Sequence, residues 1–337
     1  MRLITTKDMR QLVNQVGLSD FNKQLLEALR QAFSRWHDFQ LSPRHATHYP
    51  HGVIELMPCA DDQLYAFKYV NGHPQNTAQG KLCVVAVGML AEVDSGYPVM
   101  VCEMTWLTAL RTAATTALGA QYLARKESEV MAIIGCGAQA EFQVLALAGV
   151  RPIKSVRYFD IDPAAMAKFA HNLKGRLPSL VACKNAAETV YGADLIVTAT
   201  AAKCQDRILN ASMITPGAHI HAMGGDCPGK TELDPALLDQ AKIVVEYKPQ
   251  SIEEGEIQNR PKAVIHAELW QIVSGQSAGR ESDSELTLFD SVGFALEDYA
   301  ALRLVKQLAE QHDIGSEVEM IPELNDPKDL FGRLIEL

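Results

Sequence analysis

A glycine turn after an apolar run constrains the fold of this chain more than any other feature of its sequence. Residues 130–134 read Val-Met-Ala-Ile-Ile and predict a buried strand, and the following turn carries Gly135, Gly137 and Ala140 in the spacing G-x-G-x-x-A. The first glycine permits the tight turn, the second lets a pyrophosphate approach the backbone, and the small third residue lets the helix pack on the strand. Unpaired N–H groups at the start of that helix favour phosphate. The pattern therefore predicts a dinucleotide-binding turn.

An acidic residue stands where such a turn needs one. The next predicted strand, 156–159, leads into Asp160, which follows Gly137 by 23 positions. A carboxylate at that place bonds the hydroxyls of a ribose. Asp162 adds charge that would repel a 2′-phosphate, so the sequence predicts NAD rather than NADP. The alternative is that Asp160 only forms the turn before Pro163.

The rhythm of the chain predicts an α/β fold in two parts. From residue 130 onward strands and helices alternate, which is typical of a Rossmann-type doubly wound parallel sheet. Before it, short apolar runs separated by glycine and proline predict antiparallel strands. The predicted antiparallel strands are 53–57, 65–70, 82–87 and 99–102, and the later parallel strands include 195–198, 219–223 and 243–246.

Three helices are expected outside the alternating region. Phe21, Leu25, Leu29, Phe33 and Trp36 recur at steps of three and four, which predicts one amphipathic helix starting near a Ser19-Asp20 cap. An Ala/Leu-rich helix is expected over about 105–123. A last helix, about 294–312, is expected to lead the chain back to the first part.

Composition narrows the possible functions. The chain has 337 residues, 47% of them hydrophobic and 21% charged, and no apolar run of the length that crosses a membrane. A net charge of −10 argues against nucleic acid as a partner, since that partner needs a basic face. The N-terminus lacks the apolar core of an export signal. Together with an odd number of cysteines, seven, this predicts reduced thiols and a cytoplasmic protein.

A second glycine loop matches the sequence pattern of a triphosphate-binding motif. Residues 224–231 read Gly-Gly-Asp-Cys-Pro-Gly-Lys-Thr and satisfy G-x-x-x-x-G-K-[ST]. Asp226 would place a carboxylate inside a phosphate cradle, and Pro228 removes one of its N–H donors. The loop is better explained as part of an active site at the carboxyl end of a strand, with Asp226 facing the nicotinamide end of the cofactor.

Three histidines could suggest a metal site, but the prolines beside them argue against it. His45, His48 and His51 are spaced by three, but Pro43 and Pro50 make a helix there improbable. In an extended chain, steps of three alternate between faces. No metal is predicted.

At the level of whole segments the chain resembles the ornithine cyclodeaminase and mu-crystallin family from end to end. The glycine turn and the second glycine loop, extended to Glu232-Leu233, belong to the resemblance. The other matching segments are Ser42-Pro43-Arg44, Val53-Ile54-Glu55-Leu56-Met57-Pro58, Phe67-Lys68-Tyr69-Val70-Asn71-Gly72-His73-Pro74, Thr108-Ala109-Leu110-Arg111-Thr112-Ala113-Ala114 and Leu288-Phe289-Asp290-Ser291-Val292-Gly293. The loop at 224–233 looks more like the cyclodeaminase members than like mu-crystallin.

The resemblance implies a lyase that converts L-ornithine to L-proline and ammonia with catalytic NAD, in ornithine and arginine catabolism and proline biosynthesis. It implies a homodimer in which residues 1–112 and 313–337 form a substrate-binding and dimerisation domain and residues 113–312 form the NAD-binding Rossmann domain. Lysine conversion to pipecolate, and a non-catalytic NAD(P)-binding protein like mu-crystallin, remain alternatives.

The resemblance also assigns residues. Arg44, Lys68 and Arg111 bind the substrate carboxylate, Glu55 holds an ammonium, Val292 packs near the substrate, and Asp226 is the general base. The alternative for the three cations is that each is a surface charge, and the alternative for Asp226 is that it only forms a turn. The surface alternative is weakest for Arg111, because a buried guanidinium needs an anion. The NAD contacts implied beside Gly135, Gly137 and Asp160 are Cys83, Arg111, Ala138, Gln139, Thr200, His221, Ala222, Met223, Lys230 and Ser291. Cys83 departs from the hydroxyl residue that the family pattern leads us to expect.

Overall fold

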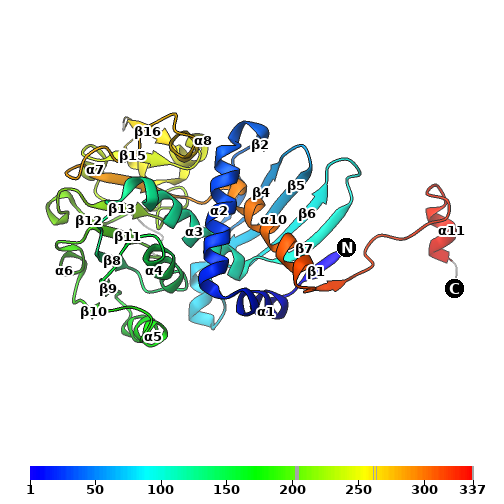
Figure 1. Ribbon diagram of the computed structural model, residues 1–337, viewed down its shortest axis with the longest axis horizontal. Helices are drawn as coiled ribbons and strands as arrows, with labels where there is room; N and C mark the ends of the chain where they lie inside the picture. The colour runs from blue at the N-terminus through cyan, green and yellow to red at the C-terminus, as the bar shows by residue number, and fades with distance from the viewer. Residues whose placement is uncertain (202–204, 261, 263, 336–337) are drawn as a thin grey trace.

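The chain folds around two large sheets that lie on either side of helix α3 (Thr105–Leu123), as Figure 1 shows. The computed structural model describes residues 1–201, 205–260, 262 and 264–335. We call the part around the N-terminal sheet, with its helices, the first lobe, and the part around the parallel sheet the second lobe. The predicted α/β class is confirmed.

The first sheet is antiparallel except at one pair. Its strand order is β18-β1-β7-β6-β5-β4-β2, with β3 also pairing to β4, and only β1 and β7 run parallel. The strands are β1 (Arg2–Ile4), β2 (Gln40–Leu41), β3 (His45–Tyr49), β4 (Gly52–Ala60), β5 (Leu64–Gly72), β6 (Ala86–Glu92), β7 (Pro98–Glu103) and β18 (Ser316–Glu317). His45 and His48 therefore lie on an extended strand, as the flanking prolines predict.

One predicted strand is misplaced. The run 82–87 lies mostly before the strand, because β6 begins at Ala86 opposite Val70, although the Asn71 and His73 N–H groups still donate to the Val85 and Cys83 carbonyls. Just before that point the Val85 N–H donates to the side-chain oxygen of Asn71 at 2.7 Å, which replaces a ladder bond. A side chain that competes with the backbone is invisible to a count of apolar residues.

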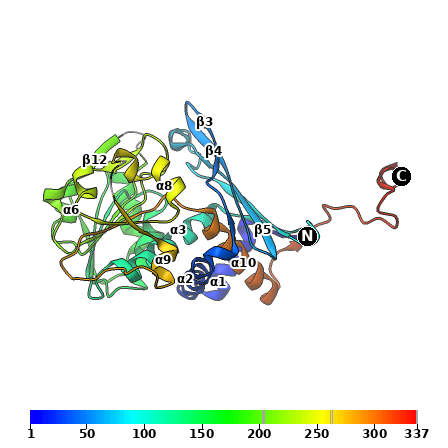
Figure 2. The same cartoon turned by 90° about the horizontal axis from the view of Figure 1, so that it is seen from above.

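Within the part of the chain that the structure describes, helices cover only one face of this sheet, as Figure 2 shows edge-on. They are α1 (Thr6–Val16), α2 (Leu18–Ser34) and α10 (Ala295–Gln311). The predicted stripe of α2 is buried in the core from Phe21 to Phe33. The predicted Ser19-Asp20 cap is wrong, because Gly17, at φ 84°, ends α1 and lets α2 begin at Leu18, and Trp36 lies beyond the helix in a 3₁₀ turn.

The opposite face of the first sheet is apolar and bare. Leu56 pairs with Tyr69 across β4 and β5, and Tyr69 pairs with Val87 across β5 and β6. Their side chains are 46%, 38% and 48% exposed. A sheet that is apolar on both faces, with only one face covered, is typical of a surface that meets a partner.

The second sheet is parallel throughout, as predicted. Its order is β10-β9-β8-β11-β13-β17-β15-β16. The chain therefore adds β9 and β10 on one side of β8 and the later strands on the other. The strands are β8 (Val130–Ile134), β9 (Ser155–Phe159), β10 (Leu180–Ala182), β11 (Leu195–Thr198), β13 (His219–Ala222), β15 (Lys242–Val245), β16 (Ile265–Glu268) and β17 (Thr287–Asp290). The glycine turn after β8 thus lies at the switch point, where such sheets bind ligands.

The helices of the second lobe complete the doubly wound arrangement. Helices α3, α4 (Ala140–Ala148) and α5 (Pro163–Leu173) pack on one face, and α6 (Ala186–Val190) and α7 (Pro235–Leu238) on the other. Helices α8 (Lys248–Glu254) and α9 (Leu269–Val273) follow β15 and β16, and β12 (Gln205–Leu209) pairs with β14 (Thr231–Leu233). No helix of the described residues is long and apolar enough to span a bilayer.

Helix α10 returns to the first lobe, as expected, and its side chains share the core of α2 and the first sheet. This packing favours a domain boundary before α10 rather than at residue 312. The division of the chain into domains stays a prediction.

Close packing of α3 on β17 makes Gly119 necessary. A Cβ at Gly119 would stand 2.5 Å from the Phe289 ring. Gly119→Ala gains about 1 kcal/mol of helix propensity but overpacks the core by about 1–3 kcal/mol. We expect the free energy of unfolding in urea to fall by about 1 kcal/mol, and Phe289→Leu to restore part of that loss in the double variant. A Gly119→Ala protein as stable as the wild type would contradict this packing argument.

Candidate active site between the lobes

A pocket of about 290 Å³ lies where the inner faces of β4 and β5 meet the carboxyl ends of the parallel strands. Most of the residues predicted from the sequence come together there. The predicted residues that line it are Arg44, Glu55, Lys68, Cys83, Arg111, Gly137, Ala138, Gln139, Thr200, Met223, Asp226, Lys230, Ser291 and Val292.

The glycine turn has the geometry that its sequence demands. Gly135 adopts φ 98°, and a Cβ there would collide with the carbonyl of Ala199. A Cβ on Gly137 would meet nothing within 4 Å, so the backbone stands open toward the pocket. Asp160 receives the Cys136 N–H at 2.6 Å and the Asp162 N–H at 2.9 Å. Asp160 therefore forms a turn and also places its carboxylate beside the glycine turn.

Arg44 joins the two lobes. Its Nη1 donates to both Glu55 oxygens on β4 at 3.1 and 3.2 Å, and its Nη2 donates to the Val292 and Gly293 carbonyls at 2.6 Å. Its Nε lies 3.1 Å from Glu254 at the end of α8. Burial acts to lower the pKa of Arg44, but the charges of Glu55 and Glu254 outweigh it and hold the pKa above its ordinary value. The inward carboxylate of Glu55 is thus already paired.

Lys68 and Arg111 are held from the start of α10. The Lys68 Nζ lies 2.9 and 2.8 Å from the two oxygens of Asp298, and the Arg111 Nε donates to Asp298 at 2.9 Å. Glu297 receives Arg111 Nη1 at 2.5 Å. Burial and the charge of Arg111 lower the pKa of Lys68 to about 8. The anion that buried Arg111 requires is therefore supplied by the protein itself.

Sequence reasoning missed these anions. Glu254, Glu297 and Asp298 belong to no recognisable motif, and they approach the cations from α8 and α10, at separations of about 190 to 230 positions. Burial raises the pKa of Glu254 to about 7, although Arg44 opposes the shift. The sequence did contain one signal for two of them. Glu297 and Asp298 are consecutive acidic residues in the first turn of a long helix, where the helix N-terminus favours negative charge.

The second glycine loop begins where β13 ends, as predicted. Strand β14 follows it, whereas a triphosphate-binding loop leads into a helix, which supports the rejection of that motif. Lys230 Nζ donates to Asp226 at 3.0 Å, and the Asp226 side chain is half exposed. The Thr200 N–H and hydroxyl both donate to Glu232, so the predicted cofactor contact Thr200 is occupied by a carboxylate of the chain.

Two buried carboxylates fix the backbone beneath this loop. Glu256 receives the N–H groups of Glu232 and Leu233 at 2.8 and 3.0 Å, and Asp290 receives those of Glu256 and Ile257 at 2.9 and 3.2 Å. Burial raises the pKa of Asp290 to about 7. The pair links the loop after β13 to the end of β17.

Four residues assigned to the cofactor do not line the pocket. Gly135 lies in the glycine turn, and Asp160, which follows β9, contacts that turn through the Cys136 N–H. His221 and Ala222 are buried in β13, which corrects their placement in the site. The His221 Nε2 shares a hydrogen bond of 2.8 Å with the Thr116 hydroxyl on α3, and burial lowers its pKa to about 3. The alternation of the strand directs this ring to α3, away from the pocket.

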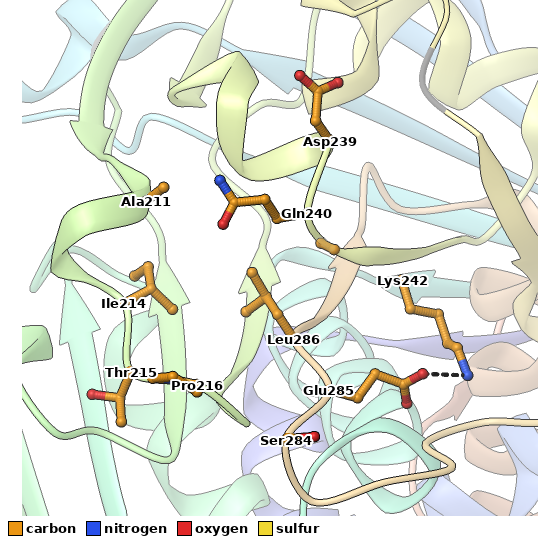
Figure 3. Close-up of a pocket in the computed structure, with 11 residues that line it drawn as sticks. Ala211, Ile214, Thr215, Pro216, Asp239, Gln240, Lys242, Ser284, Glu285 and Leu286 are labelled. Atoms are coloured by element: carbon orange, nitrogen blue, oxygen red, sulfur yellow. Dashed lines mark ion pairs between the residues drawn. The ribbon is translucent and has the colours of Figure 1, made fainter.

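Another hollow, of about 460 Å³, lies at the amino ends of β15 and β17. Figure 3 shows Lys242 and Glu285 at its side, joined by an ion pair of 2.7 Å, with Ile214 and Leu286 nearby. It contains none of the predicted site residues. The chemistry of this fold is found at the opposite edge of the sheet, so we assign the site to the first pocket.

The parallel sheet, the glycine turn at its switch point and the adjoining pocket define an α/β protein with a dinucleotide-binding fold. The profile of the ornithine cyclodeaminase/mu-crystallin family matches residues 6–313, and the chain belongs to that family.

Similar proteins agree with this. An ornithine cyclodeaminase of Agrobacterium fabrum is 48% identical over 332 residues, which cover 98% of this chain and 94% of that protein. The structure of a lysine cyclodeaminase, solved to explain its recognition of L-lysine, L-ornithine and L-2,4-diaminobutyric acid, superposes with a TM-score of 0.92 at 28% identity and covers 98% of both chains. An archaeal alanine dehydrogenase dimer with bound NAD superposes with a TM-score of 0.88 at 32% identity, covering 95% of this chain and 99% of that one.

The Asp290 carboxyl makes stability depend on pH. Its pKa is about 7 in the fold, against an ordinary value of 3.8, so the folded chain keeps a proton that the unfolded chain releases. Between about pH 4 and pH 7, raising the pH therefore favours unfolding. We expect the free energy of unfolding of the wild type to fall relative to that of Asp290→Asn across this window and to run parallel to it above pH 7, in urea titrations. The exposed Asp62→Asn is the control, and parallel profiles throughout would refute the assignment.

Proposed function

We propose that this chain converts L-ornithine to L-proline and ammonia with catalytic NAD, as a cyclising ammonia-lyase. The observation that carries the proposal is one pocket that joins a dinucleotide turn, three buried cations and the carboxylates of Glu55 and Asp226. The match to ornithine cyclodeaminases over nearly the whole chain supports it. The substrate offers one carboxylate and two amines, which is the complement of this set of charges.

The residues present fit NAD. The open backbone at Gly137, beside the start of α4, suits a pyrophosphate, and Asp160 lies where a ribose would. The side-chain oxygen of Gln139 is buried without a partner and faces the pocket, which suits a ligand donor. When bound, NAD would accept the hydride of the substrate Cα and return it after ring closure.

The cations are positioned to hold the substrate carboxylate, but each already has a partner. Arg44 and Glu55 neutralise one another at the pocket wall. An amino acid substrate carries both charges, so its carboxylate can replace Glu55 at Arg44 while its ammonium takes Glu55. An anion alone at Arg44 would leave the Glu55 carboxylate unpaired in a buried site, which costs several kcal/mol. The pair therefore selects for a zwitterion.

Asp226 is the general base of the proposal. Its carboxylate is half exposed at the pocket, and Lys230 at 3.0 Å orients it. A proton removed from the distal ammonium frees that amine to attack Cα, and ring closure within one molecule benefits from proximity by up to about 7–11 kcal/mol. Ammonia leaves from the same carbon.

The first test is a product assay with NAD and ornithine or lysine. We expect proline and ammonia in equal amounts from ornithine, with no accumulation of NADH. Stoichiometric NADH would show a dehydrogenase instead. The similar lysine cyclodeaminase fold makes lysine the second candidate substrate, and faster formation of pipecolate would favour it.

Asp226→Asn tests the base. The amide keeps the size of the side chain but cannot take the proton, so we expect kcat to fall by about 10²–10⁴-fold. Binding of NAD, followed by fluorescence quenching, should change by less than threefold. Asp239→Asn, at an exposed carboxylate in the second lobe, is the matched control. Full turnover by Asp226→Asn would remove Asp226 from the mechanism.

We further propose that two copies pair through the bare face of the first sheet. In this arrangement residues 1–112 and 313–337, with α10 packed on them, would bind substrate and form the dimer, while the second lobe would hold NAD. The apolar side chains of Leu56, Tyr69 and Val87 form adjacent cross-strand pairs on that face. The archaeal alanine dehydrogenase, a dimer, supports the proposal.

A charge on this face should separate the copies. We expect Val87→Glu to raise the dissociation constant of the dimer at least a hundredfold in sedimentation experiments, because like charges would meet across a symmetric interface. Ile161→Glu places the same charge on a residue that is 91% exposed in the second lobe and should leave association unchanged. A Val87→Glu protein that dimerises like the wild type would move the interface elsewhere.

A further inference from the structure

The end of the chain leaves the fold. After β18 the backbone runs outward and ends in α11 (Leu330–Ile335), well apart from both lobes in Figures 1 and 2. Its large apolar side chains are uncovered. Met320 is 71% exposed, Phe331 72% and Leu334 82%. Exposed apolar groups gathered on one segment are unusual on a chain that stands alone.

The sequence nevertheless specifies this helix. Asp329 receives the Gly332 N–H at 2.9 Å, which satisfies a backbone donor of the first turn. Leu330 and Leu334, and Phe331 and Ile335, lie four positions apart, so the four side chains form one apolar stripe. A helix of six residues is not stable in water by itself. Its stripe therefore needs a surface to cover it.

The point of departure indicates which surface. Strand β18 pairs with β1 at the edge of the first sheet, where Glu317 lies 3.2 Å from the Met1 amino group and 3.3 Å from Arg2 Nε. This is the sheet whose bare face we propose to meet a second copy. The twelve residues 318–329 can reach about 40 Å when extended. An arm anchored at that edge and leading away from its own lobes is placed to cross to the other copy.

We propose that residues 318–335 form an arm that docks the apolar stripe of α11 on the first lobe of a second copy of this chain. The inference rests on the proposed pairing of two copies, and adds to it an exchanged segment. The arm lies beyond residue 313, where the family match ends, and the alignment with the Agrobacterium fabrum protein reaches into it, since it covers 98% of the chain.

The direct test is a photo-crosslink from the arm. The full-length chain carries benzoylphenylalanine at position 331, and is mixed and re-equilibrated with a differently tagged wild-type chain before irradiation. We expect a crosslink between the two chains that maps to the first lobe. The same group in place of Ile161, exposed in the second lobe, should give none. A crosslink within one chain, to an unrelated protein only, or none at all would overturn the arm.

A matched pair of substitutions measures what the arm contributes. We expect Phe331→Asp to raise the dissociation constant of the dimer at least tenfold, while Asn325→Asp, which adds the same charge outside α11, changes it by less than twofold. Equal changes of the dissociation constant in the Phe331→Asp and Asn325→Asp proteins would overturn the proposal. A wild-type chain that sediments as a monomer would overturn the pairing and the arm together. The product assay with ornithine is independent of both, so the proposed reaction stands or falls separately.

Discussion

The buried ion pairs between the start of α10 and the cations of β5 and α3 hold the site together. Lys68, Arg111 and Asp298 are all at least 96% buried, and moving one such ion out of water costs several kcal/mol unless its partner is in place. The strand, the core helix and the returning helix are thus required to meet at one point. Because α3 also packs on β17 through Gly119, the same contacts orient the first lobe relative to the parallel sheet. The pocket follows from this geometry.

Pairing within the protein changes how the cations should be understood. A site with free guanidinium groups would bind any small anion, whereas Arg44, engaged by Glu55, Glu254 and two carbonyls, has little attraction left for one. A ligand gains only by exchanging partners on both sides of an ion pair. Specificity for an amino acid therefore comes from the cost of breaking the pair, and not simply from the presence of positive charge.

The sequence predicted what depends on neighbouring positions. The glycine turn, the parallel strands, the antiparallel strands β4 and β5 and the stripe of α2 all follow from local sequence patterns. What could not be predicted arises from distant contacts. Asp298 meets Lys68 across 230 positions, and Asn71 displaces the start of β6 by bonding the Val85 N–H. The resemblance assigned His221 to the cofactor, yet the pleat of β13 turns its side chain to Thr116. Likewise, α2 starts earlier than expected because Gly17 takes a left-handed conformation that composition does not reveal.

The glycines of the second loop illustrate how one pattern can serve opposite chemistry. In a phosphate cradle, glycines expose backbone N–H groups to an anion. Here a Cβ on Gly224 would collide with the Glu232 carboxylate, a Cβ on Gly225 would stand 2.6 Å from Glu256, and one on Gly255 would collide with Asp290. The glycines thus make room for carboxylates of the chain, which receive the N–H groups of Thr200, Glu232 and Glu256. Asp226 on this loop, half exposed at the pocket, presents a carboxylate that repels phosphate and favours an ammonium. That electrostatic preference, rather than the spacing of the motif, suits the loop to carry a base beside a diamino acid.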